Sequence, residues 1–456
     1  MKNISVTIKF ITPAFIGGAD NNEFSELRSA SLKGLLRYWW RALCSDDLDL
    51  NNMKTKEEKI FGGQRNRSSF DIRIYRLDNN PLQKQNKDFE NMKDSKSKEI
   101  KDGIKYLFFS LYQQKKIENK FFIPTNSQYE IEFIFKNENN IKEVLKALWA
   151  LENFGGIGAR SRRGAGSFKI INIKGLNDLK ISNSEFPKFL YMEENNKQFN
   201  IEEFYNEKIN IIQKSTKLDE FTRISNGNFK IKIINNNFTN SYDVLNHIGN
   251  VYKNFRDYRK KFKDESSALH NFLINNNQPT LPIKRVAFGL PINYKFKPPR
   301  NINDYNRLPD KIKNYILSKM SEDLRKNFNR LLQNGDNLSK NFNELGFNDD
   351  EIKELNKILN KTFTLIAKPS YGDYERRASP LFIKIGEYKN KYFGVITLFW
   401  SKFLPDNVGI SIENDFRRHE INQPDKNVIE DFINILWIGG YEWKRIIIKI
   451  TLVYFK

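Results

Sequence analysis

The chain has 456 residues, of which 76 are Lys or Arg and 55 are Asp or Glu, and its formal net charge is +21. One cysteine, Cys44, excludes an internal disulfide, and with only three separated histidines we expect neither a metal site nor a cofactor. No apolar run reaches the roughly 18 residues of a membrane span and no signal-peptide core is present, so we expect a cytoplasmic protein, and a pI near 9.6 favours a nucleic-acid partner.

The N-terminal segment predicts a strand, a turn and a helix. Residues 1–10 alternate apolar and polar side chains, and a turn rich in helix breakers follows at 12–20. A helix is expected over 31–43 because apolar residues recur there with helical spacing. The apolar face of this helix comprises Leu32, Leu35, Leu36, Trp39 and Leu43.

A basic stripe lies on the same helix, separate from its apolar face. Lys33, Arg37 and Arg41 are spaced i, i+4, i+8, with Gly34 beside the first of them. Like charges at this spacing repel, and each neighbouring pair costs about a few tenths of a kcal/mol. A helix that accepts this repulsion favours a polyanionic partner. The alternative is that the cations snorkel over the tryptophan rings of the helix.

The elements up to residue 175 are typical of a ferredoxin-like βαββαβ domain. Strands are expected at 70–76 and 127–135 and again at 167–173, and a helix with apolar periodicity precedes the last of them. The charged segment 84–102 predicts a mobile insertion. The order strand, helix, strand, strand, helix, strand then gives the fold.

The connection Gly155–Gly166 before the last strand holds five glycines and three arginines and no acidic residue. Glycines let the backbone approach a ligand closely, and arginine matches phosphate geometry. Helix first and strand second excludes the familiar nucleotide-binding loops, which have other flanking elements. The loop therefore predicts a cradle for a longer polyanion, and the alternative is a flexible turn on a basic protein.

A second ferredoxin-like domain is expected over 219–456, joined to the first by a linker or irregular connection at 176–218. Its last elements are a helix at 425–437 and, after Gly439-Gly440, a strand at 445–453. The polar helical pattern of about 303–362 predicts an inserted lobe. The predicted fold class is thus α+β, with two ferredoxin-like (RRM-like) domains and a helical insertion in the second.

The segment 253–263 combines basic residues, among them Arg256, Arg259 and Lys260, with aromatic residues at helical spacing. It predicts a helix with its aromatic face inward and its basic residues outward. RNA contact and a solvated helix face explain this pattern about equally well.

Several motifs resemble those of the repeat-associated mysterious protein (RAMP) superfamily, and more narrowly the first RAMP subunit of the type III-B CRISPR effector, the Cmr complex. They are the turn at 12–20, the Ser-x-Lys-Gly-x-x-Arg core with its Arg-Tyr-Trp-Trp-Arg extension at 31–41, the loop at 155–166, and the segments Phe288–Pro291 and Arg376–Leu381. On the residues and the resemblance together, the expected RNA-binding residues are Lys33, Gly34, Arg37, Arg41, Gly156, Gly158, Arg160, Arg162, Arg163, Arg256, Arg259, Lys260, Arg376 and Arg377.

The resemblance implies a subunit that holds the 3′ part of a guide RNA (crRNA) in antiviral defence. Its implied partners are guide RNA, target RNA and other RAMP and Cmr subunits, and it implies no membrane. Recognition would use the RNA backbone and shape, because base pairing carries the sequence information. We expect no enzyme activity. The alternatives are a RAMP endoribonuclease that cuts target RNA through Asp20, a guide-processing nuclease that uses His247, and a pure assembly protein.

Overall fold

The computed structural model describes residues 1–17, 25–43, 49–64, 66–78, 87–112, 121–176, 188–193, 195–196, 198–212, 222–224, 229–257, 261–334, 340–370 and 375–436. The chain divides into two compact units. Unit 1 comprises residues 1–255, 380–402 and 429–456, and unit 2 comprises residues 256–379 and 403–428. Each unit is described by itself.

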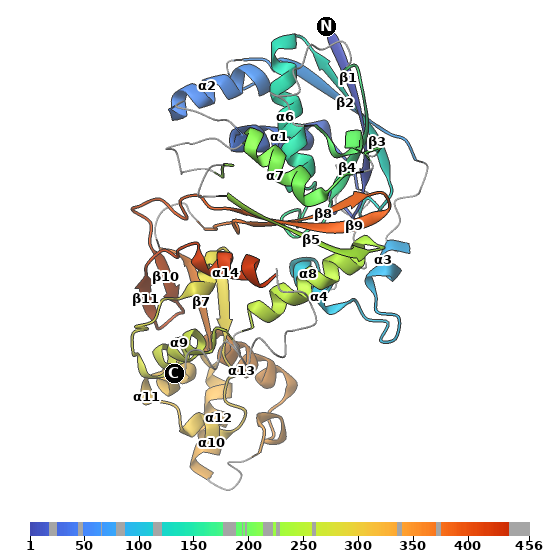
Figure 1. The fold of residues 1–456 in the computed structure, drawn as a ribbon. Coiled ribbons are helices and arrows are strands. Elements are labelled where there is room, and N and C mark those ends of the chain that lie inside the picture. The colour runs from blue at the N-terminus through green and yellow to red at the C-terminus, as the bar shows by residue number, and fades with distance from the viewer. Residues whose placement is uncertain are drawn as a thin grey trace, which may run out of the picture. The chain divides into compact units, whose positions relative to one another are not determined.

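The first half of unit 1 is a ferredoxin-like domain (Figure 1). Its elements are β1 (Lys2–Phe10), α1 (Ser29–Leu43), α2 (Leu50–Phe61), β2 (Phe70–Arg76), α3 (Lys87–Met92), α4 (Asp102–Leu107), α5 (Phe109–Tyr112), β3 (Gln128–Phe135), α6 (Ile141–Phe154) and β4 (Phe168–Lys174). The strands pair antiparallel in the order β2-β3-β1-β4, with α1 and α6 as the two crossover helices. This topology confirms the predicted ferredoxin-like fold.

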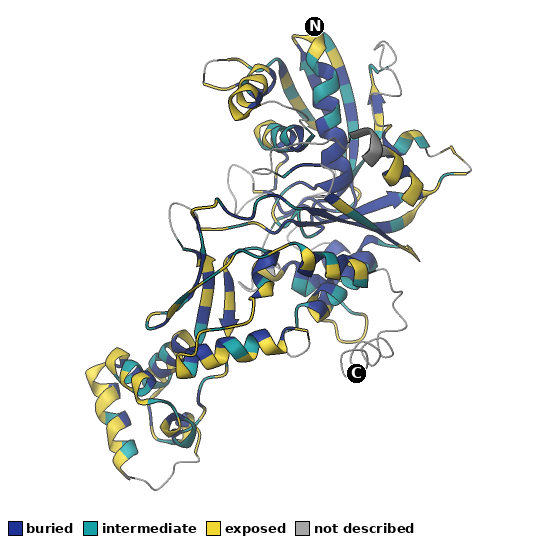
Figure 2. Ribbon diagram, turned by 60° about the vertical axis from the view of Figure 1, so that its left-hand side comes forward, coloured by how far each residue is buried: buried dark blue, intermediate teal, exposed yellow. Residues whose placement is uncertain are grey.

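Side chains that alternate between buried and more exposed positions place one face of this sheet in the core. Along β1 and β3 every second residue is buried, because successive side chains of a strand point to opposite faces. Helix α6 is buried over almost its whole length (Figure 2). The buried residues of β1 are Ile4, Val6, Ile8 and Phe10.

The second half of unit 1 repeats the plan. Its elements are α7 (Ile201–Ile212), β5 (Phe229–Phe238), α8 (Ser241–Phe255), β8 (Leu381–Tyr388), β9 (Lys391–Phe399) and α14 (Asn427–Ile435), of which α14 begins in unit 2. The three strands form an antiparallel sheet in the order β5-β9-β8. The strand predicted at 445–453 and Gly439-Gly440 lie outside the described residues.

Aromatic rings join the two sheets of unit 1. Phe154, the last residue of α6, has its ring centroid 5.8 Å from that of Phe399, and Trp39 of α1 lies 5.8 Å from Phe382. Since α6 meets the first sheet on one side and the second sheet on the other, every residue from Ala147 to Phe154 is buried. The two halves of unit 1 therefore share one core.

The segment predicted as a mobile insertion is folded where it is described, over 87–102. Phe89 and Met92 are buried, and the Asp94 carboxylate accepts hydrogen bonds from the N–H groups of Lys96 and Ser97 at 3.0 Å each. Farther along, α4 crosses α8 so closely that a Cβ on Gly103 would lie 2.0 Å from the Asn246 carbonyl oxygen. The sequence did not predict this folded structure, because most of its buried apolar residues are isolated among charged residues.

Unit 2 is a four-stranded antiparallel sheet with a set of helices, in the order β11-β10-β7-β6. Its elements are α9 (Lys263–Asn275), β6 (Ile292–Lys295), α10 (Ile302–Asn306), α11 (Asp310–Lys319), α12 (Glu322–Asn334), α13 (Asp349–Thr362), β7 (Thr364–Pro369), β10 (Ile410–Glu413) and β11 (Arg418–Ile421). Helices α10 to α13 cover the predicted lobe at about 303–362, although α10 begins one residue earlier. The predicted division at 175 and 218 stays a prediction.

The helix predicted across 253–263 is wrong. Helix α8 ends at Phe255, whose ring packs 5.3 Å from that of Phe432, and α9 begins at Lys263 after the buried Phe262. Arg256 and Asp257 between them are not helical. The aromatic spacing of 253–263 would fit one continuous helix. Tertiary packing of Phe255 and Phe262 outweighs this local pattern.

Candidate nucleic-acid interface

The basic stripe of α1 is anchored by a carboxylate from α2. Glu57 is buried, and its two oxygens lie 3.3 Å from Arg37 Nε and 3.5 Å from Arg41 Nε. Arg37 Nη2 also donates a hydrogen bond of 2.6 Å to the carbonyl of Gly62. The two arginine side chains remain 33% and 35% exposed. One carboxylate thus orients two guanidinium groups, relieves part of their repulsion and leaves both able to reach a ligand.

The first cation of the stripe has a different setting. Lys33 Nζ donates to Ser68 Oγ at 3.1 Å and to the Phe70 carbonyl at 3.2 Å, and it lies 4.9 Å from the Phe70 ring centroid. Burial lowers the pKa of this ammonium. Lys33 is therefore held by β2 and its approach rather than by a tryptophan.

Gly34 lies on the exposed side of α1, and a Cβ built there would meet nothing within 4 Å. Packing within the described residues therefore gives no reason for glycine in this helix. Glycine inside a helix costs about 0.8–1.0 kcal/mol relative to alanine. A glycine with no protein atoms packed against it allows the backbone of a ligand to approach the helix closely.

Helix α2, which contacts α1, carries further cations. Its exposed lysines are Lys54, Lys56 and Lys59. Together with Lys33, Gly34, Arg37 and Arg41 of α1 they form what we call the α1–α2 face. Helices α1 and α2 together carry six cations against Glu57 and Glu58, so the pair of helices keeps a positive excess. The sequence does not single out α2, because its charges are mixed and it carries no motif.

The glycine-rich loop 155–166 is packed into unit 1 and is not the flexible turn of the alternative reading. A Cβ on Gly156 would lie 2.8 Å from the Ala165 carbonyl oxygen, and one on Gly166 would lie 1.8 Å from that of Ile157. Gly158 and Gly164 have φ of +98° and +87°, which L side chains rarely adopt. These glycines serve the close approach of protein backbone in this structure.

Many N–H groups of the loop already donate to protein carbonyls. Ile157 N bonds to Gly166 O at 2.9 Å, Ala159 N to Phe15 O at 2.8 Å and Gly166 N to Pro13 O at 2.8 Å. An anion-binding concavity needs such groups free. The contacts therefore favour a structural role for the loop, and the phosphate cradle stays a prediction.

The three loop arginines contact neighbouring elements of unit 1. Arg160 Nε donates to Ser110 Oγ at 2.8 Å. The Arg162 guanidinium lies 4.6 Å from the Phe382 ring centroid, and that of Arg163 lies 4.9 Å from the Tyr252 ring. Burial lowers the pKa of Arg160 and Arg162, although both stay charged. Arginine here stacks on aromatic rings of the second sheet and of α8.

The remaining predicted residues lie in unit 2. The Arg256 guanidinium lies 5.1 Å from the Phe288 ring, and Arg377 exchanges backbone hydrogen bonds with Leu290. Arg376 is exposed. Arg259 and Lys260 lie outside the described residues.

Residues considered for chemistry give no assembled site among those described. Asp20 lies outside the described residues. His247 packs 5.7 Å from the Phe238 ring, and burial lowers its pKa. Trp40 is buried and donates from Nε1 to Glu143 at 2.9 Å, so it is a core residue. No cluster of metal-ligating side chains occurs within the described ranges, and no helix there could span a membrane.

Comparisons with known proteins identify the chain's relatives. The family model described as RAMP superfamily matches residues 7–169. The chain is 32% identical over 176 residues to CRISPR system Cmr subunit Cmr1-2 of Pyrococcus furiosus, a match that covers 36% of this chain and 92% of that protein. It is 32% identical over 167 residues to subunit Cmr1-1 of the same organism, over 36% of this chain and 46% of that protein, which is less than half its length.

The chain also matches solved structures. The crystal structure of apo Cmr1 from Pyrococcus furiosus matches 95% of this chain and 97% of its own, with 20% identity and a TM-score of 0.48. A chain of the type III-B Cmr-beta complex bound to cognate target RNA matches 95% and 98%, with 15% identity and a TM-score of 0.46.

Proposed function

Because the chain belongs to the RAMP superfamily, with the Cmr1 subunits of CRISPR systems as its relatives, we propose that it is an RNA-binding subunit of a type III-B CRISPR ribonucleoprotein. In this role it holds the 3′ part of the guide RNA and contacts the guide–target duplex in antiviral defence. Its partners are guide RNA, target RNA and the other RAMP and Cmr subunits. It positions RNA and does not cut it.

The observation that carries RNA binding is the α1–α2 face. Arg37 and Arg41 are oriented by Glu57 and stay about one-third exposed. Gly34, which lies one turn before Arg37, has no side chain and leaves the helix surface open. Arginine forks bind phosphate in two hydrogen bonds, and a bare helix surface lets the sugar–phosphate backbone come close. Contacts of this kind read backbone shape, which is what a subunit needs when base pairing reads the sequence.

The test measures binding of the full chain to single-stranded RNA at about 50 and about 200 mM salt. Replacing Lys56 and Lys59 by Gln should weaken binding and reduce the slope of log affinity against log salt, by about 0.7 for each lost phosphate contact. The matched control replaces Lys326 and Lys353, exposed lysines of unit 2 that form ion pairs on their own helices.

A wild-type chain that binds no RNA would refute the proposed function. If the control pair changes the slope as much as the α1–α2 pair does, binding follows net charge and not this face.

A further inference from the structure

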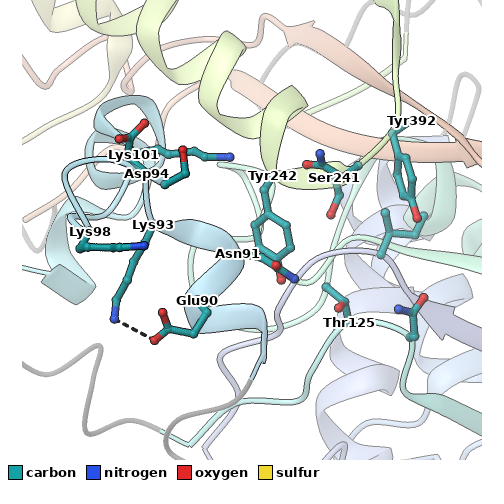
Figure 3. Close-up of a pocket in the computed structure, with 14 residues that line it drawn as sticks. Glu90, Asn91, Lys93, Asp94, Lys98, Lys101, Thr125, Ser241, Tyr242 and Tyr392 are labelled. Atoms are coloured by element: carbon teal, nitrogen blue, oxygen red, sulfur yellow. Dashed lines mark hydrogen bonds and ion pairs between the residues drawn. The ribbon is translucent and has the colours of Figure 1, made fainter.

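A pocket of about 440 Å³ lies in unit 1, away from the residues of the α1–α2 face. It opens where the turn at 93–101 faces the first turn of α8 and the strand β9. Figure 3 shows Lys93, Lys98 and Lys101 on one side, Tyr392 on the other and Tyr242 between them. Its volume falls within the roughly 300–1,000 Å³ of small-ligand pockets.

The charges around the pocket are nearly balanced. Lys93 pairs with Glu90 at 2.8 Å and Lys101 with Asp243 at 2.9 Å. Asp94 is held in its turn by two backbone N–H groups, which lower its pKa. In the part of the chain that the structure describes, Lys98 has no carboxylate partner. The pocket thus lacks the strong positive electrostatic potential that would attract an RNA duplex. It offers one unpaired ammonium group, that of Lys98, to a single phosphate.

The opposite wall is rigid and partly aromatic. The Tyr242 hydroxyl donates to Asp88, whose carboxylate also accepts from Thr125 N at 2.8 Å, so α8, α3 and the approach to β3 are tied together. The Tyr392 ring is half-buried at the wall. The part of the pocket around Tyr242 is thus formed before any ligand arrives, which reduces the cost of ordering on binding.

Two amide side chains also line the pocket. Asn91 and Asn126 each carry two donors and an acceptor on the side-chain amide. The edge of an unpaired base presents the complementary mixture of acceptors and donors. A free phosphate ion would contact the lysine but neither the aromatic wall nor the two amides.

We propose that this pocket binds one unpaired RNA nucleotide, with its phosphate at Lys98, its base against Tyr392 and the base edge toward Asn91 and Asn126. The proposal rests on the RNA-binding function above and deepens it by adding a site for a single unpaired nucleotide. Stacking of a base on an aromatic ring is tolerant of sequence, whereas an amide beside its edge gives a preference among bases.

The first experiment uses the full chain with single-stranded RNA in which 4-thiouridine replaces uridine. After irradiation, mass spectrometry should find crosslinked peptides that contain Tyr392 or residues 91–101. Tyr392→Leu should weaken binding about fivefold or more, the loss expected for one stacked base. Tyr392→Phe keeps the ring and should bind nearly as tightly as the wild type.

The second experiment removes the free ammonium. Lys98 has φ of +59°, and asparagine tolerates this conformation, so Lys98→Asn removes the charge with little backbone strain. The salt slope should fall by about 0.7. Lys389→Asn is the matched control, because Lys389 has φ of +47° and does not line the pocket.

The outcomes separate this proposal from the proposed function. If the wild type binds RNA, but Lys98→Asn and Tyr392→Leu bind as tightly and every crosslink lies outside the pocket, the pocket proposal is wrong and the function stands. If Tyr392→Phe loses as much affinity as Tyr392→Leu, the stacked base is refuted. A wild type that binds no RNA refutes both.

Discussion

Gly34→Ala should move stability and RNA affinity in opposite directions. Gly34 lies inside α1 on its exposed side, and the structure leaves room for a methyl group. Alanine should therefore raise the free energy of unfolding of unit 1 by about 0.8–1.0 kcal/mol. The same methyl group would hold an RNA backbone away from Arg37, and losing one charge-assisted hydrogen bond, about 1.5–3 kcal/mol, weakens binding roughly 10- to 150-fold.

Tryptophan fluorescence during denaturation reports the stability of unit 1, because all six tryptophans fall within its bounds. Fluorescence anisotropy with labelled single-stranded RNA reports affinity. The matched control is Asn206→Ala, which raises helix propensity at an exposed position of α7, so it should stabilise unit 1 and leave RNA binding unchanged. A Gly34→Ala variant that is stabilised yet binds RNA as tightly as the wild type would show that no RNA backbone approaches α1 here. A destabilised variant would show that the packing argument is wrong.

Four further substitutions test other parts of the structure. Leu36→Ala empties a fully buried site and should cost about 2–5 kcal/mol of stability, seen as a lower melting temperature. Arg163→Ala removes a guanidinium from the Tyr252 ring and should cost about 1 kcal/mol without changing the salt slope of RNA binding; a flatter slope at unchanged stability would restore the phosphate cradle. Burial raises the pKa of Glu152 to about 7 and lowers that of its buried neighbour Lys384. Below pH about 7 the folded state therefore holds a proton on Glu152 that the unfolded state has already lost, so the Glu152 contribution to stability falls as pH rises from about 4.5 to about 7, whereas Lys384 gives the opposite slope at higher pH. Glu152→Gln should remove the fall below pH about 7 in denaturation curves at several pH values, and an unchanged pH profile would contradict the assignment. Asp20→Ala should leave the product bands of target-RNA cleavage by an assembled complex unchanged, and loss of one band would make this chain a nuclease.

Local patterns predicted the first domain well. Alternation along β1, β2 and β3 placed those strands, because one face of the sheet is buried and the other is not. The spacing of Leu32 and Leu36 placed α1 for the same reason. Each of these elements has one apolar side that is buried, so its own residue pattern predicts it without knowledge of the element it packs against.

The candidate site was only partly predictable, because its partners lie far away in the sequence. Nothing near Arg37 indicates that Glu57 will orient it, and nothing in the glycine-rich loop indicates that Arg162 will stack on Phe382, more than 200 residues later. Glycine and arginine are needed for phosphate and for close protein packing alike. Residue type alone therefore could not separate the two roles.

The division of unit 2 into two stretches of chain has a consequence for synthesis. The helices and strands of the first sheet have all been made once β4 has left the ribosome, so they can begin to fold while the rest of their shared core is still being made. Helix α8 emerges next, but its partner strands β8 and β9 follow only after residues 256–379, and Phe432, which packs on Tyr252 and Phe255, comes later still. During that interval the residues of α8 that pack on β8 and β9 stay uncovered, although α4, which packs on another part of α8, has already been made. We therefore expect nascent chains stopped between residues 256 and 380 to be the ones that chaperones hold longest.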